Sequence, residues 1–331
     1  MRIGLTYDLC SEWLALGYAP EDVAEFDTDE TIDILDETIR SLGHRTDRIG
    51  HARSLCARLV AGDRWDLVFN IAEGLRGRGR EALVPALLEL YGIGYTFADP
   101  LACATTLDKS VAKRLIREAG LPTPAFRVVQ DEADLRDLPS WELRWPLFAK
   151  PVAEGTGKGI AETSRVETPE ELEACCRDIL TRLREPVLVE EYLPGREFTV
   201  GILGNGPSAR AIGSMEVVFL KPEARTIYSF ATKHDYEDLV DYQPVAAPAL
   251  RARIEALAVA AFRVLECRDG ARADIRLDAA GEPSFLEINP LPGLNALHSD
   301  LPLLAQMHGM EFRDLIAGIL DAACQRLGVG P

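Results

Sequence analysis

The sequence predicts an α/β fold, with an α+β arrangement in the later part of the chain. In the first third, strand-like and helix-like segments alternate, which is typical of a parallel sheet with helices on its faces. The apolar run at 66–71 has the length of a buried parallel strand. From about residue 194, strand-like segments follow one another as in an antiparallel sheet, interrupted by one long helix at 246–267.

The N-terminal part contains segments with clear helix or strand patterns. Apolar residues recur at helical spacing in 29–43, and Gly43 marks the end of that helix. A loop rich in Gly and Arg follows the third strand-like segment, where a parallel sheet presents its ligand edge. The expected elements are strands at 2–7, 45–50 and 66–71 and helices at 29–43, 52–60 and 81–92.

The middle of the chain begins with a basic segment in an otherwise acidic protein. We expect one helix at 105–124, ending at Gly120 and carrying Lys109, Lys113 and Arg114. The later expected strands are 126–129, 146–151, 159–166, 187–193, 196–203, 209–219, 271–278 and 283–290, with helices at 169–184, 246–267 and 311–327.

Composition excludes several classes of protein. The 331 residues suit two or three subdomains, and 47% hydrophobic with 27% charged residues is ordinary for a soluble protein. A formal net charge of −17 argues against a nucleic-acid partner. The seven cysteines are scattered without a C-x-x-C pair, which favours a reducing cytoplasm. No signal peptide is expected, and no apolar run approaches the roughly 20 residues that span a membrane.

Two strands on either side of the turn DAAGEP form a predicted hairpin with one charged face. If the hairpin is symmetric about the middle of its turn, Asp274 lies opposite Glu287, and Arg272 lies opposite Asn289. Two carboxylates directly opposite each other destabilise a sheet, and a divalent cation between them reverses that effect. Two carboxylates and one amide are hard oxygen ligands, which suit Mg²⁺ better than zinc.

The alternative to a metal site is a solvated outer face on this hairpin. Strand alternation assigns Leu286 and Ile288 to the opposite, apolar face. The rigid, glycine-containing exit NPLPG after the second strand is not explained by a solvated face. The pattern therefore favours a magnesium site at Asp274, Glu287 and Asn289.

A glycine-rich loop follows Lys150, which ends an apolar strand. Gly155, Gly157 and Gly159 would let backbone N–H groups approach phosphate oxygens closely. The loop is neither a Walker motif nor a dinucleotide fingerprint, because no Ser or Thr follows Gly157-Lys158 and no helix opens after the loop. An ordinary flexible hairpin is the alternative, but a buried ammonium at Lys150 requires an anion and favours the phosphate site.

Two further segments carry candidate ligand-binding residues. Glu190, Glu191 and Glu197 flank an apolar strand, where carboxylates and backbone could bind an adenine amino group and ribose hydroxyls, or simply face solvent. Lys233 and His234 lie in a long irregular stretch, which is either a lid or a loop.

Taken in order, these motifs resemble the ATP-grasp superfamily and, within it, the D-alanine–D-alanine ligases. The resemblance extends from about DLVFNI to the C-terminus. It is specific because the motifs occur in this order, whereas no single motif would identify the family. The motifs are LDKSVAKRLIREAGLPTP, PLFAKPVAEGTGKG, LVEEYLPGREFTV, ATKHDYE and RADIRLDAAGEPSFLEINPLPGL.

The resemblance implies three domains: a pre-ATP-grasp domain at 1–100, a central subdomain with the glycine loop at 101–190, and a C-terminal subdomain with the metal site at 191–331. ATP would be clamped between the last two. Glu190 and the backbone near Tyr192 would hold adenine. The residues implied at the ribose and phosphates are Glu197, Lys109, Lys150, Lys233, Glu154, Gly155, Thr156, Gly157 and Gly159.

The resemblance also implies the catalytic groups. Arg272 would stabilise developing negative charge, Lys233 would lie near the γ-phosphate, and Gly293 would present its backbone N–H to the reacting carboxylate. Two Mg²⁺ ions, which Mn²⁺ could replace, would bind at the hairpin carboxylates. A small-molecule carboxylate would be phosphorylated by ATP, and an amine would then form the amide.

The sequence departs from that family in the parts that bind the two substrates. The glutamate motif that holds the first substrate's amino group is absent, and only Asp8 or Glu12 stands nearby. The loop EGLRGRGRE carries Arg76, Arg78 and Arg80, which either bind a carboxylate or phosphate of a larger substrate or are solvated.

Two other candidate substrate residues follow the ATP motifs. His234 replaces the tyrosine that usually follows the lid lysine. Ser299, in a stretch one residue longer than usual, would reach the second substrate's carboxylate. We therefore expect a carboxylate–amine ligase, in the cytoplasm and commonly a homodimer, that joins two D-alanines or another pair. A carboxylate kinase of the same fold and a nucleotide-binding protein without activity are the alternatives.

Overall fold

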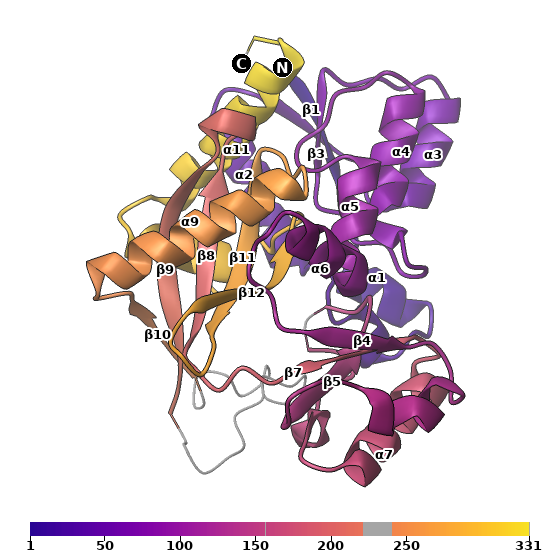
Figure 1. The fold of residues 1–331 in the computed structure, drawn as a ribbon. Coiled ribbons are helices and arrows are strands. Elements are labelled where there is room, and N and C mark those ends of the chain that lie inside the picture. Colours follow the sequence, from indigo (N-terminus) through magenta and orange to yellow (C-terminus); the bar gives the residue numbers. More distant parts are fainter. Residues whose placement is uncertain (156, 221–239, 331) are drawn as a thin grey trace.

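The chain folds around three sheets, each with helices packed on it (Figure 1). The computed structural model describes residues 1–155, 157–220 and 240–330. The two ends of the chain lie close together beside the parallel sheet. No helix in these three ranges is both long enough and apolar enough to cross a membrane.

The N-terminal sheet is parallel, as the alternating pattern predicts. Its strand order is β2-β1-β3, and Ile3 lies beside both Thr46 and Leu67. The elements of this part are β1 Arg2–Thr6, α1 Cys10–Ala15, α2 Asp29–Ser41, β2 Arg45–Arg48, α3 Ala52–Val60, β3 Leu67–Asn70 and α4 Leu83–Leu90. Helix α2 begins where the Thr28 side chain accepts a hydrogen bond from the backbone N–H of Thr31, because its free N-terminal donors need such a partner.

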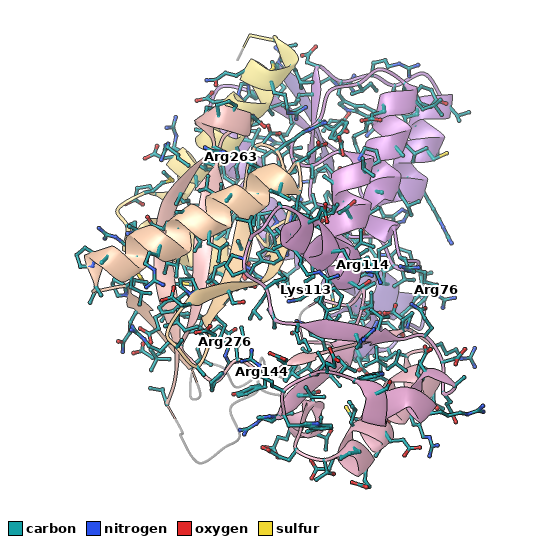
Figure 2. The ribbon with its side chains drawn as sticks, viewed as in Figure 1. Arg76, Lys113, Arg114, Arg144, Arg263 and Arg276 are labelled. Carbon is teal, nitrogen blue, oxygen red and sulfur yellow. The ribbon has the colours of Figure 1, made fainter. Side chains whose placement is uncertain are left out.

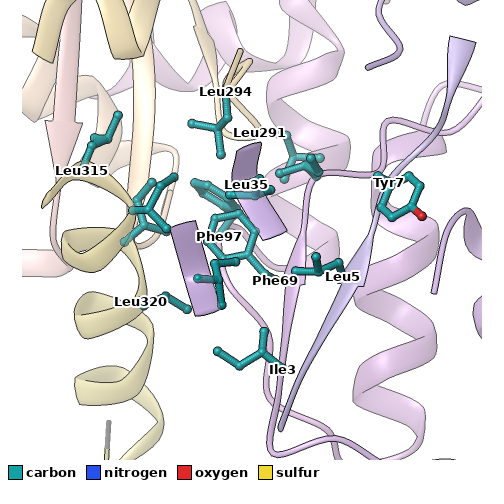
Figure 3. Packing of buried hydrophobic residues seen from close by; sticks show 14 of the residues in the cluster. Ile3, Leu5, Tyr7, Leu35, Phe69, Phe97, Leu291, Leu294, Leu315 and Leu320 are labelled. Carbon is teal, nitrogen blue, oxygen red and sulfur yellow. The ribbon is translucent and has the colours of Figure 1, made fainter. Parts of the chain in front are cut away.

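The core of the N-terminal sheet includes helices from the other end of the chain. Ile3, Leu35 and Phe69 are fully buried and pack with Leu315 of α11 (Phe312–Leu327) and Leu301 of α10 (Asp300–Met307). Figure 3 shows this packing from close by. The C-terminal helices therefore tie the parallel sheet to the five-stranded sheet.

The central part holds a four-stranded antiparallel sheet in the order β4-β7-β5-β6. Its core, which includes Val129, Ala149 and Val189, packs against α7 on the outer side of the sheet (Figure 1). The elements are α5 Pro100–Leu107, α6 Lys109–Glu118, β4 Phe126–Val129, β5 Leu147–Pro151, β6 Arg165–Val166, α7 Pro169–Arg182 and β7 Val187–Glu191.

A five-stranded antiparallel sheet in the order β10-β9-β8-β11-β12 completes the fold. Its apolar face, including Phe198, Ile275 and Phe285, packs on α9, while α10 packs on the other face of β8. The elements are β8 Glu197–Leu203, β9 Arg210–Phe219, β10 Val240–Pro244, α9 Pro248–Val264, β11 Gly270–Leu277 and β12 Pro283–Asn289.

Two predicted elements differ from the structure. The single helix expected at 105–124 is two helices, because the Asp108 carboxylate turns the chain and accepts hydrogen bonds from the backbone N–H groups of Ser110 and Val111 at the start of α6. The strand expected at 159–166 is only Arg165–Val166, because turns occupy 157–159 and a 3₁₀ segment precedes β6. Sequence patterns also missed the short elements α1, α10 and β10.

The domain ranges stay a prediction. The parallel sheet lies inside 1–100 and the five-stranded sheet inside 191–331. Strand β7 extends to Glu191 and so crosses the predicted boundary at 190.

Candidate active site

The hairpin of β11 and β12 has the predicted register. Asp274 lies opposite Glu287, and Arg272 lies opposite Asn289. A bulge then shifts the pairing so that Ile275 lies opposite Phe285.

The bulge makes the sequence assignment of Leu286 wrong. Leu286 is the extra residue in β12, and it lines the cavity on the charged face instead of joining the apolar face. Phe285 takes the core position and is fully buried against α9.

The two carboxylates of the hairpin stand in different electrostatic environments. Burial and the nearby charge of Glu287 raise the pKa of Asp274 to about 7, although Arg272 opposes this effect. Burial would also raise the pKa of Glu287, but Lys109 and Lys150 outweigh it and lower that pKa to about 2. The site thus holds one fixed negative charge and a second carboxyl group that a cation would ionise.

Arg272 is held in place from two sides. Its guanidinium lies 3.0 Å from the Asp274 carboxylate and 2.7 Å from the carboxylate of Asp300 at the start of α10. The Thr199 hydroxyl donates a hydrogen bond to the other oxygen of Asp274, at 3.1 Å. These contacts fix the orientation of Arg272 and Asp274 in the cavity.

Two predicted phosphate lysines converge on Glu287. The Nζ atoms of Lys109 and Lys150 lie 3.8 Å and 3.4 Å from Glu287 Oε2. Lys109 opens α6, and its Nζ also donates to the carbonyl of Glu154 in the glycine loop, at 2.6 Å. The two ammonium groups therefore meet at the hairpin from two elements, α6 and β5.

Lys113 is a site residue that the sequence did not assign. It is fully buried, its Nζ lies 2.8 Å from Glu190 Oε2, and Lys150 lies 3.1 Å from the other oxygen of Glu190. Burial lowers the pKa of Lys113 to about 8 even though Glu190 raises it. The sequence could have indicated this role, because Lys113 lies one turn after Lys109 on the same helix. Figure 2 labels Lys113 on α6.

A first cavity lies between the four-stranded and five-stranded sheets. Phe148, Ile160 and Leu286 give it apolar walls next to the charged groups. The predicted adenine and ribose residues Glu190, Tyr192 and Glu197 all line it.

Arg276 orders the side of this cavity where Tyr192 and Glu197, predicted at the adenine and ribose, lie. Its guanidinium donates to the Tyr192 hydroxyl at 2.9 Å and to Glu197 at 3.1 Å, and it stacks over the Tyr192 ring. Glu191, by contrast, pairs at 2.7 Å with the exposed Arg144. Figure 2 labels both arginines.

The glycine loop is bound to the N-terminal domain. The backbone N–H of Gly155 donates to Glu25 Oε1 at 2.6 Å, and Arg80 donates to Glu25 Oε2 and to the carbonyl of Ala153, both at 2.7 Å. Gly157 lines the first cavity, while Gly159 packs close to Pro151 at a φ of 73°. Glu154 pairs with Lys158 at 3.2 Å. Thr156 lies outside the described residues.

A second cavity, of about 500 Å³, extends from the hairpin to the N-terminal domain. Asn289, Gly293 and Ser299 line it, together with Lys109 and Arg272. The Ser299 hydroxyl accepts a hydrogen bond from the backbone of Asn295, and a Cβ at Gly293 would come within 2.8 Å of that hydroxyl.

Other candidate substrate residues lie elsewhere. Arg78 pairs with Asp108, and Arg80 with Glu25. Arg76 lies at the outer edge of the N-terminal part over the Tyr18 ring (Figure 2). Lys233 and His234 are outside the described residues.

The residues weighed as substitutes for the missing amino-binding motif do not line the second cavity. Asp8 is buried and accepts hydrogen bonds from the Trp13 indole and from the Gly74 backbone, and Glu12 is exposed on α1.

Comparison with known proteins shows the family to which the chain belongs. The family described as "D-ala D-ala ligase C-terminus" matches residues 115–321. The chain is 36% identical to the D-alanine–D-alanine ligase of Bordetella petrii over 276 residues, which cover 82% of this chain and 80% of the relative. The chain belongs to the D-alanine–D-alanine ligase family.

Two further relatives are similar to this chain over about three quarters of its length. A Sinorhizobium fredii protein, "Uncharacterized protein y4sG", is 37% identical to this chain over 266 residues, covering 78% of this chain and 75% of that protein. The D-alanine–D-alanine ligase of Bordetella avium is 36% identical over 255 residues, covering 76% and 77%.

Solved structures of a D-alanine–D-alanine ligase and of a D-Ala:D-Ser ligase share the fold. The ligase of Bacillus anthracis, complexed with ATP, superposes with a TM-score of 0.71 at 21% identity over 98% of both chains. The VanG D-Ala:D-Ser ligase of Enterococcus faecalis superposes with a TM-score of 0.75 at 20% identity, over 97% of this chain and 99% of that one. The predicted ATP-grasp fold is confirmed, and family membership identifies the chain as an ATP-dependent, ADP-forming ligase.

Proposed function

We propose that this protein joins the carboxylate of one small amino acid to the amine of another, through an acyl phosphate and with release of ADP. The observation that carries the proposal is the convergence of Lys109, Lys150 and Arg272 on the Asp274–Glu287 pair, where the two cavities meet. Phosphoryl transfer depends on charge neutralisation and alignment, which such a cluster supplies.

ATP would occupy the first cavity and reach the junction with its phosphates. Adenine would lie between the apolar side chains of Phe148 and Leu286, with the ribose near Glu197. Glu190 has a role beyond the one expected from sequence, because it anchors Lys113 and Lys150. Lys150 would hold the phosphates under the glycine loop.

The hairpin residues fit Mg²⁺. Mg²⁺ in phosphate-transfer sites is bound by one or two carboxylates together with phosphate oxygens. Asp274, Glu287 and Asn289 offer this donor set. The raised pKa of Asp274 shows that the charge of Arg272 does not offset burial and the charge of Glu287, which a divalent cation would do. Bound Mg²⁺ would neutralise charge on the transferred phosphate.

The reaction would proceed in two balanced steps. A carboxylate oxygen of the donor attacks the γ-phosphorus, the bond to ADP breaks, and an acyl phosphate forms beside Arg272 and the backbone N–H of Gly293. The neutral amine of the acceptor then attacks the acyl carbon, phosphate leaves, and the amine loses a proton. Enclosure of this junction by the glycine loop would limit hydrolysis of the acyl phosphate.

The test is ADP release from Mg-ATP against a panel of single amino acids and pairs, D and L, with mass spectrometry of the products. The proposal requires amine-dependent turnover and an amide product. ADP release with a stable phosphorylated carboxylate and no response to amines would indicate a kinase instead.

Two further expectations concern the oligomeric state and the cellular location of the protein. We propose a homodimer in the cytoplasm, based on the family resemblance. Analytical ultracentrifugation at micromolar concentration tests the first, and cell fractionation tests the second.

A further inference from the structure

The N-terminal wall of the second cavity is lined by carboxylates. Glu25 and Asp27 precede α2, and Glu73 and Glu81 flank the arginine-rich loop between β3 and α4. Lys109, Arg272 and Gly293 line the same cavity, and the donor carboxylate would react near them.

Only Glu25 among these four has a charged partner in the described part of the chain. It accepts hydrogen bonds from Arg80 and from the backbone of Gly155. The side chains of Asp27, Glu73 and Glu81 form no ion pair or hydrogen bond with described residues. Glu81 is only 6% exposed, and its Oε2 is a buried oxygen with no partner there.

Such a group of carboxylates is unfavourable in the free protein. Burial raises the pKa of Glu81 to about 8 and that of Asp27 to about 7. Burial and the charges of Glu81 and Glu25 raise the pKa of Glu73 as well. Buried ionised groups need a partner of opposite charge, and Arg80 is already paired with Glu25.

One ammonium group cannot balance this wall. A simple α-amino acid brings one positive charge, whereas three carboxylates form no ion pair with a described residue. The cations whose charge acts on Glu73 or Glu81 are paired elsewhere, Arg80 with Glu25 and Lys109 with Glu287. The cavity volume of about 500 Å³ falls within the range of about 300–1,000 Å³ that holds drug-sized ligands, so a longer donor has room. Among the described residues, no group of three or more His, Cys, Asp or Glu side chains has the geometry to hold a metal ion.

We propose that the carboxylate donor is a dibasic amino acid, whose second amino or guanidino group binds the wall formed by Asp27, Glu73 and Glu81. The inference rests on the proposed ligase function and names the substrate class of that site. The donor carboxylate lies at Arg272 and Gly293, and its basic groups point away from the reacting centre toward the N-terminal domain.

The experiment compares donors that differ only in the second charge. Lysine, ornithine and arginine are assayed beside Nε-acetyl-lysine and alanine, each as both enantiomers, with Mg-ATP and a panel of amine acceptors. Calorimetric titration of lysine and Nε-acetyl-lysine, with Mg²⁺ and a non-hydrolysable ATP analogue present, gives binding without turnover. We expect the dibasic donors to exceed their acetylated or neutral counterparts by about tenfold or more in kcat/KM and in affinity.

Variants of the wall sharpen the comparison. Glu81→Gln should lower kcat/KM for the dibasic donor by about tenfold and leave that for Nε-acetyl-lysine within about threefold, since Gln keeps the shape but removes the charge. Glu73→Gln is the second variant, should Glu81→Gln fail to fold. Glu12→Gln, on the exposed face of α1, is the matched control and should change neither donor.

The outcomes separate this inference from the proposed function. Amide product from neutral and dibasic donors with equal kcat/KM overturns the inference and leaves the ligase function standing. Amide product from no pair overturns the function, and equal calorimetric affinity for lysine and its acetylated form then overturns the inference independently.

Discussion

The proposed ATP-binding junction and the N-terminal wall of the second cavity contrast in how their charges are balanced. At the junction, every carboxylate named above has a cation nearby, as Glu190 has Lys113 and Lys150. On the N-terminal wall, Asp27, Glu73 and Glu81 form no ion pair with a described residue, although the charge of Arg80 acts on Glu73 and Glu81 and that of Lys109 acts on Glu81. The first region holds its geometry through its own ion pairs, whereas we infer that the second binds a cation that a substrate brings.

The same contrast runs through the sequence. Motifs at the junction resemble the D-alanine–D-alanine ligases closely, and those on the wall depart from them. Residues that bind ATP can stay the same whichever substrates are joined, whereas residues that bind the donor must match that donor. The predictions below test each side of this comparison.

The largest effect is expected at the hairpin. Glu287→Gln removes the fixed negative charge that faces Lys109 and Lys150, and we expect kcat to fall about a thousandfold, because metal and phosphate alignment would be lost. Glu282→Gln, in the turn of the same hairpin and paired with exposed Arg253, is the control. Steady-state ADP release measures both, and full activity in Glu287→Gln would show that the metal assignment is mistaken.

Lys113 should contribute mainly to stability. Lys113→Met leaves Glu190 buried with one cation instead of two, and we expect the free energy of unfolding to drop by about 3 kcal/mol. Arg114→Met, next along α6 but exposed, should change it by less than about 0.5 kcal/mol. Urea denaturation measures both variants, and equal midpoints would contradict the assigned role of the buried pair.

The N-terminal wall should make the free protein less stable as pH rises. Glu81 has its folded pKa raised to about 8 from 4.5, so its protonated form favours folding at low pH, and that stability is lost as pH rises through about 8. We expect the free energy of unfolding to fall by about 1 kcal/mol or more from pH 5 to pH 8.5. Thermal or urea unfolding across this range should give a flatter profile for Glu81→Gln, and parallel profiles would argue against a buried, unbalanced Glu81.

The smallest effect on activity is expected at Glu25, which connects the N-terminal wall to the glycine loop. Glu25→Gln weakens the charge-assisted hydrogen bonds to Arg80 and to the Gly155 backbone, so the glycine loop should be held less firmly over the phosphates. We expect KM for Mg-ATP to rise about fivefold at saturating donor, with kcat changed less. Glu21→Gln, which removes a surface pair with Arg182, should leave KM unchanged. An unaltered KM in Glu25→Gln would show that Glu25 does not help to hold the glycine loop over the phosphates.

Sequence reasoning was strongest where contacts are local. The register of the hairpin followed from its short turn, because a symmetric turn determines which residues of the two strands face each other. The β-bulge that moved Leu286 into the cavity had no sequence signal, since it depends on how the sheet packs against α9. The sequence could have shown that the helix expected at 105–124 is interrupted at Asp108, because Asp is a preferred N-cap residue.

Residues brought together from distant segments were harder to predict. Lys113 meets Glu190 only in the folded chain, and no spacing in the sequence connects them. The wall of Asp27, Glu73 and Glu81 comes from two loops whose proximity depends on parallel strand order. The sequence drew attention to the arginines of the second loop, whereas its glutamates line the cavity.

The central claim, an acyl phosphate between ATP and an amine, is tested most directly by isotope transfer. A donor amino acid labelled with ¹⁸O in both carboxylate oxygens is turned over with Mg-ATP and an acceptor, and the phosphate and the amide are analysed by mass spectrometry. The account predicts one ¹⁸O in the released phosphate and one in the amide carbonyl. Unlabelled phosphate beside a labelled amide would contradict it, because the donor oxygen would then never have been bonded to phosphorus.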